Sequence, residues 1–330
     1  MSMILVTGGT GFVGSHLLRS LVKNKDASNR VRAIRRKRSN MALVADIANQ
    51  IEWVETDVLD ITGLMEAMQG VKQVYHSAAM ISFVGSDRDK MIKINAQGTA
   101  NVVNAALETG IEKLLHVSSI AALGRSAVNN QVDEKTAWED SPFNTNYGLS
   151  KLLAEREVWR GVAEGLTAVV VNPSVILGKG DWEQSSGRLF SRVWNGLNFC
   201  PRGGTGFVDV LDLVNAMLAL MDSPLSNERY VLNGENLSYR EFFALVAQNM
   251  QKKAPRWEAS PLLAAFARPF DALRSKITGS PPLITRETMA MSSRRFYYSN
   301  AKIKEALPDF RFSPIEATIK RVCEEFMVDR

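Results

Sequence analysis

The chain has 330 residues, 45% hydrophobic and 23% charged, which is the balance of a globular protein with one large domain or two modest ones. No apolar run approaches the roughly 18–20 residues that cross a bilayer, and the N-terminus lacks the basic stretch of a secretory signal, so we expect a cytoplasmic protein without stable membrane insertion. Two cysteines and three histidines exclude a disulfide framework and predict that no metal is bound. The formal net charge is +5, and part of the excess lies at 30–38, a run without acidic residues.

Short apolar runs alternate with helical patterns through the first half of the chain. This alternation is typical of βαβ units that build a parallel sheet. The expected strands are 3–7, 30–34, 51–55, 74–76, 113–118 and 167–172, and the expected helices are 15–23, 92–109 and 147–160.

After residue 172 the pattern loosens. Helical segments are expected near 187–196, 211–221 and 239–252, separated by turns rich in glycine and proline, and 229–232 is expected as an edge strand. The sequence therefore predicts an α/β fold with a doubly wound parallel sheet and a smaller, mostly helical C-terminal lobe. That lobe should lie over the carboxyl ends of the strands, where open α/β sheets bind ligands.

A glycine-rich turn, TGGTGFVG at 7–14, follows the first expected strand and opens the first helix. Its glycines fit the dinucleotide fingerprint, both as G-x-G-x-x-G and in a form with wider first spacing. Glycine permits the tight turn and a close approach of the backbone to a pyrophosphate, and the helix N-terminus offers unpaired N–H groups to the phosphates. The residues predicted to bind the cofactor here are Gly8, Gly11, Phe12, Val13 and Gly14.

The end of the second strand should distinguish the two nicotinamide cofactors. An acidic residue there would bind the ribose 2′-hydroxyl of NAD, but the chain places Arg35, Arg36, Lys37 and Arg38 at this point. Arginine suits bidentate phosphate contact, so we expect NADP(H), with Arg36 or Arg35 on the 2′-phosphate. A solvated basic loop with NAD(H) as the cofactor is the alternative. The position of the run favours one phosphate group over a nucleic acid.

A second motif, YGLSK, places Tyr147 and Lys151 four residues apart on a predicted helix, and therefore on one helical face. A nearby ammonium favours the phenolate, which lowers the pKa of the phenol toward the range of a general acid or base. About thirty residues upstream the fifth strand ends in Val-Ser-Ser, so the hydroxyl of Ser119, or of Ser118, is expected beside the phenol.

Taken together, these three motifs resemble the short-chain dehydrogenase/reductase superfamily, in particular its extended branch, the NAD-dependent epimerase/dehydratase family. The resemblance implies a Rossmann fold in which 1–173 and about 206–234 bind NADP, while about 174–205 and 235–330 form the substrate lobe. It implies a catalytic set of Ser119, Tyr147 and Lys151: Tyr147 exchanges a proton with the substrate oxygen, Lys151 binds the ribose hydroxyls, and Ser119 orients the substrate oxygen.

The same resemblance implies further contacts with the cofactor. In the family an acid after the third strand contacts the adenine, small residues after the fourth strand flank the cofactor, and a proline-containing segment lies by the nicotinamide. The matching residues are Asp57, Val58, Ser77, Ala78, Ala79, Pro173 and Ser174. Asn95 matches a position that is usually structural. The chain departs from the family's R-P-x-x-x-Y-G segment, with Asn172 for the arginine and Leu177 for the tyrosine.

Segment 203–212 lacks the arginine with which nucleotide-sugar enzymes of this branch hold a diphosphate, and FVDVLDL looks more like the dihydroflavonol 4-reductase-like subgroup. We therefore expect an NADP(H)-dependent oxidoreductase that reduces a ketone or aldehyde, or oxidises an alcohol, on a small to medium, fairly apolar substrate. One alternative is a nucleotide-sugar epimerase or dehydratase with Arg188, Arg192 and Arg202 on the diphosphate. A non-catalytic cofactor sensor is the other, although such proteins commonly lose the Tyr or the Lys, and both are present here.

Two features stay open at this level. Segment 261–275 has apolar residues at near-helical spacing, which fits either an apolar lid or ordinary packing of a small lobe. A homodimer through the helix that carries YGLSK and the helix before it is implied by the resemblance, but the same apolar residues would serve a monomer core.

Overall fold

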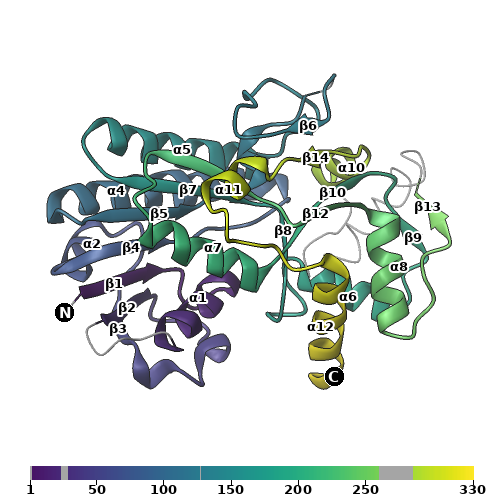
Figure 1. Cartoon of the computed structure of the whole chain (residues 1–330), viewed down its shortest axis with the longest axis horizontal. Coiled ribbons are helices and arrows are strands. Elements are labelled where there is room, and N and C mark those ends of the chain that lie inside the picture. Colours follow the sequence, from purple (N-terminus) through teal and green to yellow (C-terminus); the bar gives the residue numbers. More distant parts are fainter. Residues whose placement is uncertain (1, 24–28, 127, 260–284) are drawn as a thin grey trace.

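The fold is described from a computed structural model that covers residues 2–23, 29–126, 128–259 and 285–330 (Figure 1). Its centre is a seven-stranded sheet in which every neighbouring pair is parallel. The strands, in order across the sheet, are β11 (Glu228–Leu232), β7 (Ala168–Pro173), β5 (Lys113–Val117), β4 (Val71–His76), β1 (Ser2–Thr7), β2 (Asn29–Arg35) and β3 (Glu52–Glu55). The predicted doubly wound Rossmann fold is confirmed, and 229–232 is an edge strand as expected.

Helices cover both faces of this sheet, so its strands are buried on both sides and their sequences are almost continuously apolar. On one face α1 (Phe12–Lys23) and α7 (Val210–Asp222) pack in one core cluster with alternate strand residues such as Val6. On the other face α2 (Ile61–Ala67), α4 (Gly98–Thr109) and α5 (Asn146–Ala163) pack with the intervening residues such as Leu5. Figure 1 shows the two helical layers above and below the sheet.

A second group of elements lies beyond the carboxyl ends of the strands, at the right of Figure 1. It contains a three-stranded sheet of β8 (Val175–Leu177), β10 (Gly204–Asp209) and β12 (Glu235–Ser238), with the helices α6 (Gly187–Trp194), α8 (Tyr239–Asn249) and α12 (Ile315–Val328). These elements share a core of their own, in which the rings of Phe207 and Phe242 stack with centroids 4.5 Å apart. The mostly helical lobe expected from the sequence therefore has a small sheet at its base.

Shorter elements complete the described chain. They are α3 (Arg88–Ile92), a π-helical turn (Lys93–Gln97), α10 (Arg286–Ser292), α11 (Ala301–Ala306), the 3₁₀ turns Ala42–Val44, Ala48–Gln50, Gly85–Asp87 and Ile120–Leu123, and the strands β6 (Gln131–Val132), β9 (Phe199–Cys200), β13 (Trp257–Glu258) and β14 (Tyr297–Tyr298). Strand β14 pairs with β6 and β13 with β9, each in parallel. Segment 261–275, a candidate lid in the sequence, lies outside the described residues.

The single helix expected over 92–109 is in fact three pieces: the end of α3, the π-helical turn and α4. The turn carries Asn95, which is buried. The Asn95 side chain accepts a hydrogen bond from the main-chain nitrogen of Met80 at 2.7 Å and donates to the Met80 carbonyl at 2.9 Å. A wider helical turn is a local change that hydrophobic periodicity does not reveal, because the apolar face continues through it.

Candidate active site

The glycine turn is built around backbone contacts that leave no room for side chains. Gly8 has a φ of +72°, and a Cβ at this position would lie 2.6 Å from the main-chain nitrogen of Ala78. A Cβ at Gly14 would lie 2.2 Å from the carbonyl oxygen of Gly8, which also accepts a hydrogen bond from the Gly11 nitrogen at 2.9 Å. The turn thus presents bare backbone and the N-terminus of α1, which begins at Phe12 and continues with Val13. This cradle fits the pyrophosphate of a dinucleotide.

The segment after β4 is fastened to the end of β1 beside this turn. The Ser77 hydroxyl donates to the carbonyl of Thr7 at 2.7 Å, and the Ala78 nitrogen donates to the Thr7 hydroxyl at 3.3 Å. That hydroxyl also contacts Nδ1 of His76 at 2.7 Å, and burial lowers the pKa of His76 to about 3, so the imidazole is neutral. Ser77, Ala78 and the exposed Ala79 therefore line the space next to Gly8.

Ser119, Tyr147 and Lys151 meet at the carboxyl end of β5. Ser119 is the second residue after the end of β5 at Val117. Its hydroxyl accepts a hydrogen bond from the Ala121 nitrogen at 3.1 Å and so caps a 3₁₀ turn. Tyr147 lies in the first turn of α5, where the Ser119 side chain is near enough to lower the pKa of the phenol. One turn later the Lys151 ammonium, 2% exposed, donates to the Val117 carbonyl at 2.8 Å. The structure therefore brings the three predicted catalytic side chains together.

Burial acts on the two titratable groups in opposite directions. It raises the pKa of Tyr147 to about 12, an effect that the nearby Ser119 side chain opposes. It lowers the pKa of Lys151 to about 8, an effect that the Glu155 carboxylate opposes. At neutral pH the phenol is therefore protonated and the lysine is mostly charged, which is the state needed to give a proton to a substrate oxygen.

The family model described as the NAD dependent epimerase/dehydratase family matches residues 4–233. The chain belongs to this family. Sterol demethylase protein B of Methylococcus capsulatus is 31% identical over 78% of each chain, and the putative dihydroflavonol 4-reductase of Synechocystis is 29% identical over 92% of this chain and 88% of its own. This chain is also similar to the crystal structure of gox2253, with 30% identity and a TM-score of 0.84. The match covers 100% of this chain and 99% of the gox2253 chain.

The cofactor-binding residues predicted outside the glycine turn lie at the ends of neighbouring strands. Arg35 ends β2, and the adjacent Arg36 is exposed, with its main-chain nitrogen bound to the Ser39 hydroxyl at 3.0 Å. Among the described residues no acidic side chain pairs with either guanidinium. The earlier arginines of the basic run differ, because Arg30 and Arg32 both pair with Glu52. Only part of the run is therefore available to hold a phosphate.

Asp57 and Val58 follow β3, next to the end of β2. The Asp57 carboxylate accepts a hydrogen bond from the Leu59 nitrogen at 3.0 Å, and Val58 is buried against the start of α4. These residues and the two arginines lie at the ends of β2 and β3, away from the catalytic group at the end of β5. That separation suits a dinucleotide whose adenosine end lies over β2 and β3, as in the family to which the chain belongs.

Pro173 and Ser174 end β7 and begin the connection to the second lobe. The Ser174 nitrogen donates to the Leu232 carbonyl at 3.0 Å, while its buried hydroxyl has no hydrogen-bond partner within the described part of the chain. Asn172, one residue earlier, turns its amide toward the catalytic group. It donates to the main-chain carbonyl of Ser119 at 3.0 Å and to the Glu155 carboxylate at 2.6 Å.

Sequence reasoning missed two neighbours of the catalytic group. Glu155 lies four residues after Lys151, so helical spacing alone places it on the same face, and this was the available signal. Phe83, in the loop after β4, lies edge-on to the Tyr147 ring with centroids 6.1 Å apart. No motif marked Phe83, because a loop has no periodicity. Of the arginines considered for a diphosphate, Arg202 pairs with Glu258 at 3.8 Å, and Arg188 and Arg192 lie on α6.

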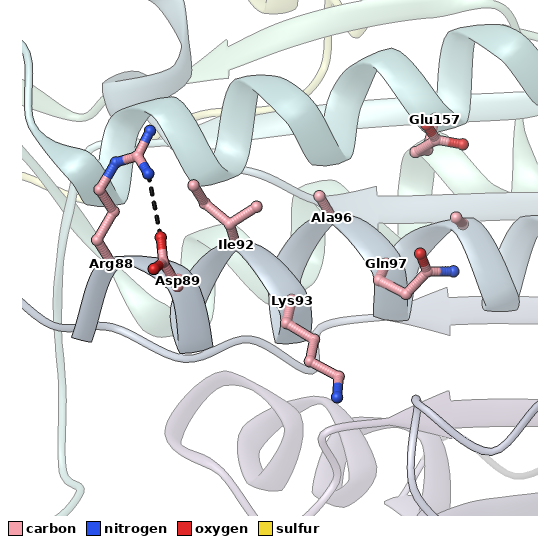
Figure 2. Close-up of a pocket in the computed structure, with 8 residues that line it drawn as sticks. Arg88, Asp89, Ile92, Lys93, Ala96, Gln97 and Glu157 are labelled. Atoms are coloured by element: carbon pink, nitrogen blue, oxygen red, sulfur yellow. Dashed lines mark hydrogen bonds and ion pairs between the residues drawn. The ribbon is translucent and has the colours of Figure 1, made fainter. Parts of the chain in front are cut away.

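A groove of about 530 Å³ runs between the α3–α4 region and α5, away from the catalytic group (Figure 2). Arg88 and Asp89 form an ion pair at one end, 3.1 Å between Nη1 and Oδ1, and Glu157 of α5 lies on the opposite wall. Its lining combines charged or polar side chains with the apolar Ile92, Ala96 and Ala100. The groove follows the two helices through which we expected a dimer, but it contains none of the predicted site residues.

Membrane-spanning helices and metal-binding clusters can be assessed only for the described residues. In the ranges that the structure covers, no helix combines the length and apolar character that a membrane span requires. Within the same ranges no group of three or more His, Cys, Asp or Glu side chains is placed to hold a metal ion.

Proposed function

We propose that the protein is an NADP(H)-dependent oxidoreductase that interconverts a ketone or aldehyde and an alcohol on a small to medium, fairly apolar substrate. The observation that carries this proposal is the convergence of Ser119, Tyr147 and Lys151 at the end of β5, beyond the glycine turn. A degenerate cofactor sensor would have no reason to keep a protonated phenol and a buried ammonium in contact with the same strand end.

The chemistry divides between the cofactor and the side chains. When bound, the nicotinamide supplies or accepts the hydride at the substrate carbon. Tyr147 gives its proton to the substrate oxygen during reduction and takes it back during oxidation. The hydroxyl of Ser119 donates a hydrogen bond to that oxygen and fixes its position. Lys151 is charged, which stabilises the phenolate of Tyr147 as it forms, and its remaining N–H groups are available to the ribose hydroxyls.

The preference for the phosphorylated cofactor rests on Arg35 and Arg36. Both stand at the end of β2, where the ribose 2′ position is expected, and a guanidinium without an acidic partner can bind a phosphate in a bidentate manner. We also propose that the other predicted cofactor positions, from Gly8 to Ser174, contact the cofactor, because they lie in the glycine turn or near the carboxyl ends of strands.

An apolar substrate is supported by the surroundings of Tyr147. Phe83 faces its ring, and Ile81 in the same loop is 52% exposed. Strand β10 lies within segment 203–212, where nucleotide-sugar enzymes of this branch carry a diphosphate-binding arginine. This strand is buried and contains no arginine. Two similar proteins are named for a sterol and a dihydroflavonol, which are both largely apolar molecules.

The experiment that tests the function follows NADPH absorbance against a panel of aldehydes, ketones, dihydroflavonols, steroids and nucleotide sugars. We expect stoichiometric oxidation of NADPH with an apolar carbonyl compound. Conversion of a nucleotide sugar without net change of the cofactor would refute the proposal in favour of an epimerase or dehydratase.

We also propose the division of the chain into a cofactor part, 1–173 with about 206–234, and a substrate part, about 174–205 with 235–330. Helix α7 and strand β11 pack with the large sheet, which supports the first part. The boundary near 206 falls inside β10, whose strand pairs belong to the small sheet. Hydrogen exchange should show protection by NADPH mainly in the cofactor part; equal protection of both parts would contradict the division.

A homodimer through α4 and α5 is proposed as well, with the groove of Figure 2 at its edge. Sedimentation analysis should give twice the chain mass of 36.5 kDa. A monomer at micromolar concentration would contradict this.

A further inference from the structure

A buried chain of polar contacts leads from the catalytic group to the outer strand of the sheet. Glu155, on α5 one turn after Lys151, is 1% exposed. One of its carboxylate oxygens accepts a hydrogen bond from the Asn172 amide at 2.6 Å, and the other accepts from the guanidinium of Arg229 at 3.2 Å. The same Asn172 amide reaches the main-chain carbonyl of Ser119 at 3.0 Å.

Arg229 is held in this position from the other side. Its side chain is 23% exposed, and two of its nitrogens donate to the main-chain carbonyl of Glu134. The Glu134 carboxylate in turn accepts from the nitrogen of Val231, on the free edge of β11, at 2.7 Å. The Arg229 guanidinium therefore links the Glu134 main chain at the edge of the sheet to the buried Glu155 carboxylate.

We propose that Glu155 is a positioning residue for both halves of the catalytic group: it maintains the charge of Lys151 directly and the main chain of Ser119 through Asn172, with Arg229 as its counterion. This inference rests on the proposed function. The physical reason is that a buried carboxylate requires partners, and one of the two side chains that hydrogen-bond Glu155, Asn172, also holds the main-chain carbonyl of Ser119. A buried ion pair placed only for stability would have no need of the Ser119 carbonyl.

This chain has its own solution to the environment of Glu155. Asn172 of β7 offers Glu155 a neutral amide and no positive charge. Arg229 of the neighbouring strand β11 supplies the guanidinium, because β11 pairs with β7 and Val231 is the register partner of Asn172. The counterion of Glu155 thus comes from the strand next to β7, and a neutral amide lies next to Ser119.

The electrostatic part of the proposal has a sign that can be tested. The charged or titratable groups that act on Lys151 are Glu155 on its own helix, His76 of β4 and His116 of β5. Burial lowers the pKa of both histidines, raises that of Tyr147 to about 12 and lowers that of Lys151 to about 8, so the test follows the titration of Lys151.

The experiment measures the titration midpoint of Lys151 in the full-length protein by NMR of ¹³C-labelled lysine, with the resonance assigned through Lys151→Arg. Glu155→Gln removes a negative charge and should lower the midpoint by about half a pH unit or more. Arg229→Met removes a positive charge from the same carboxylate and should raise it. The control is Glu157→Gln, the same substitution two residues later on α5, where the carboxylate pairs with Arg160 near the surface.

Opposite shifts in the two variants would support the proposal, because loss of packing alone does not change sign with the charge removed. No shift in either variant, or shifts in the same direction, would overturn it. If Glu155→Gln does not fold, the direction of the Arg229→Met shift still decides. This titration needs no substrate, so it stands even where the panel of carbonyl compounds shows no turnover and the proposed function fails.

The Ser119 part has a separate variant. Asn172→Leu keeps the approximate volume but removes the amide that holds the Ser119 carbonyl. We expect turnover to fall about tenfold or more, with the Lys151 midpoint and the cofactor affinity unchanged. Turnover equal to the unmodified protein's would remove Asn172 from the proposal.

Discussion

At the scale of single residues, the site depends on the cost of burying charge. Tyr147 and Lys151 would each be ionised more readily in water than the fold allows, since burial moves the pKa of the phenol up and that of the ammonium down. At neutral pH the phenol therefore keeps its proton beside a mostly charged ammonium.

The first prediction concerns Tyr147→Phe. This variant keeps the aromatic ring and its packing against Phe83 but removes the proton. Turnover should fall below about a thousandth of the unmodified rate, while the dissociation constant for NADPH stays within about twofold. Steady-state kinetics and fluorescence titration measure the two quantities. Retained turnover would exclude the phenol as the acid.

The second prediction concerns cofactor choice. The double substitution of Arg35 and Arg36 by serine should weaken NADPH binding about tenfold or more and leave NADH binding nearly unchanged, because in our proposal each guanidinium contacts only the additional phosphate. Arg30→Ser is the matched control, since Arg30 already pairs with Glu52. Equal losses for both cofactors, or equal affinities before substitution, would contradict the assignment of NADP(H).

At the scale of elements, the glycine turn joins β1 to α1 and sets how closely a ligand can approach the helix N-terminus. Gly8 needs its left-handed backbone, whereas Gly14 needs the absence of a Cβ. The two glycines are therefore required for different reasons. The requirement at Gly14 can be tested by a substitution, because its φ is one that other residues adopt.

We predict that Gly14→Ala lowers the free energy of unfolding by about 1–3 kcal/mol and weakens cofactor binding, because its Cβ would lie 2.2 Å from a backbone oxygen that cannot move aside easily. Gly85→Ala is the control, as nothing lies within 4 Å of a Cβ built at that position. Urea unfolding and NADPH titration measure both effects. Equal behaviour of the two variants would show that the turn can expand.

At the scale of the whole molecule, two buried imidazoles at the centre of the sheet should make the free energy of unfolding depend on pH. His76 and His116 lie on adjacent strands with ring centroids 5.0 Å apart, and burial lowers the pKa of both. In the unfolded chain their pKa is about 6.5. Below that pH the unfolded state therefore binds protons that the folded state does not bind.

It follows that the free energy of unfolding should decrease as pH falls below about 6.5, by up to about 1.4 kcal/mol per pH unit for each such histidine. His116→Phe should make this slope smaller, and comparison with the unmodified protein cancels the contributions of the carboxylates. Urea unfolding at pH 7.5, 6.0 and 5.0 tests this. An unchanged slope would mean that the His116 imidazole is protonated within the fold.

Much of the architecture could be predicted because its signals are local. The strand runs, the glycine turn and the YGLSK motif each lie within a few residues, and together they led to the doubly wound sheet and to Ser119, Tyr147 and Lys151. The small sheet of β8, β10 and β12 could not be predicted, since its strands are short and about 25 residues of chain separate each strand from the next. The break of the expected helix at Asn95 depends on the Met80 backbone, which no periodicity reports.

By itself, the sequence indicated the candidates for the catalytic group, because a motif's spacing on a helix or turn already sets which side chains share a face. Only the tertiary structure decided what surrounds them. Arg30 and Arg32 are tied to Glu52 while Arg35 and Arg36 are not, and Glu155 is joined to Asn172 and to Arg229 from a strand 57 residues beyond Asn172. Such partners are set by the strand order of the sheet, and strand order is a property of the folded chain.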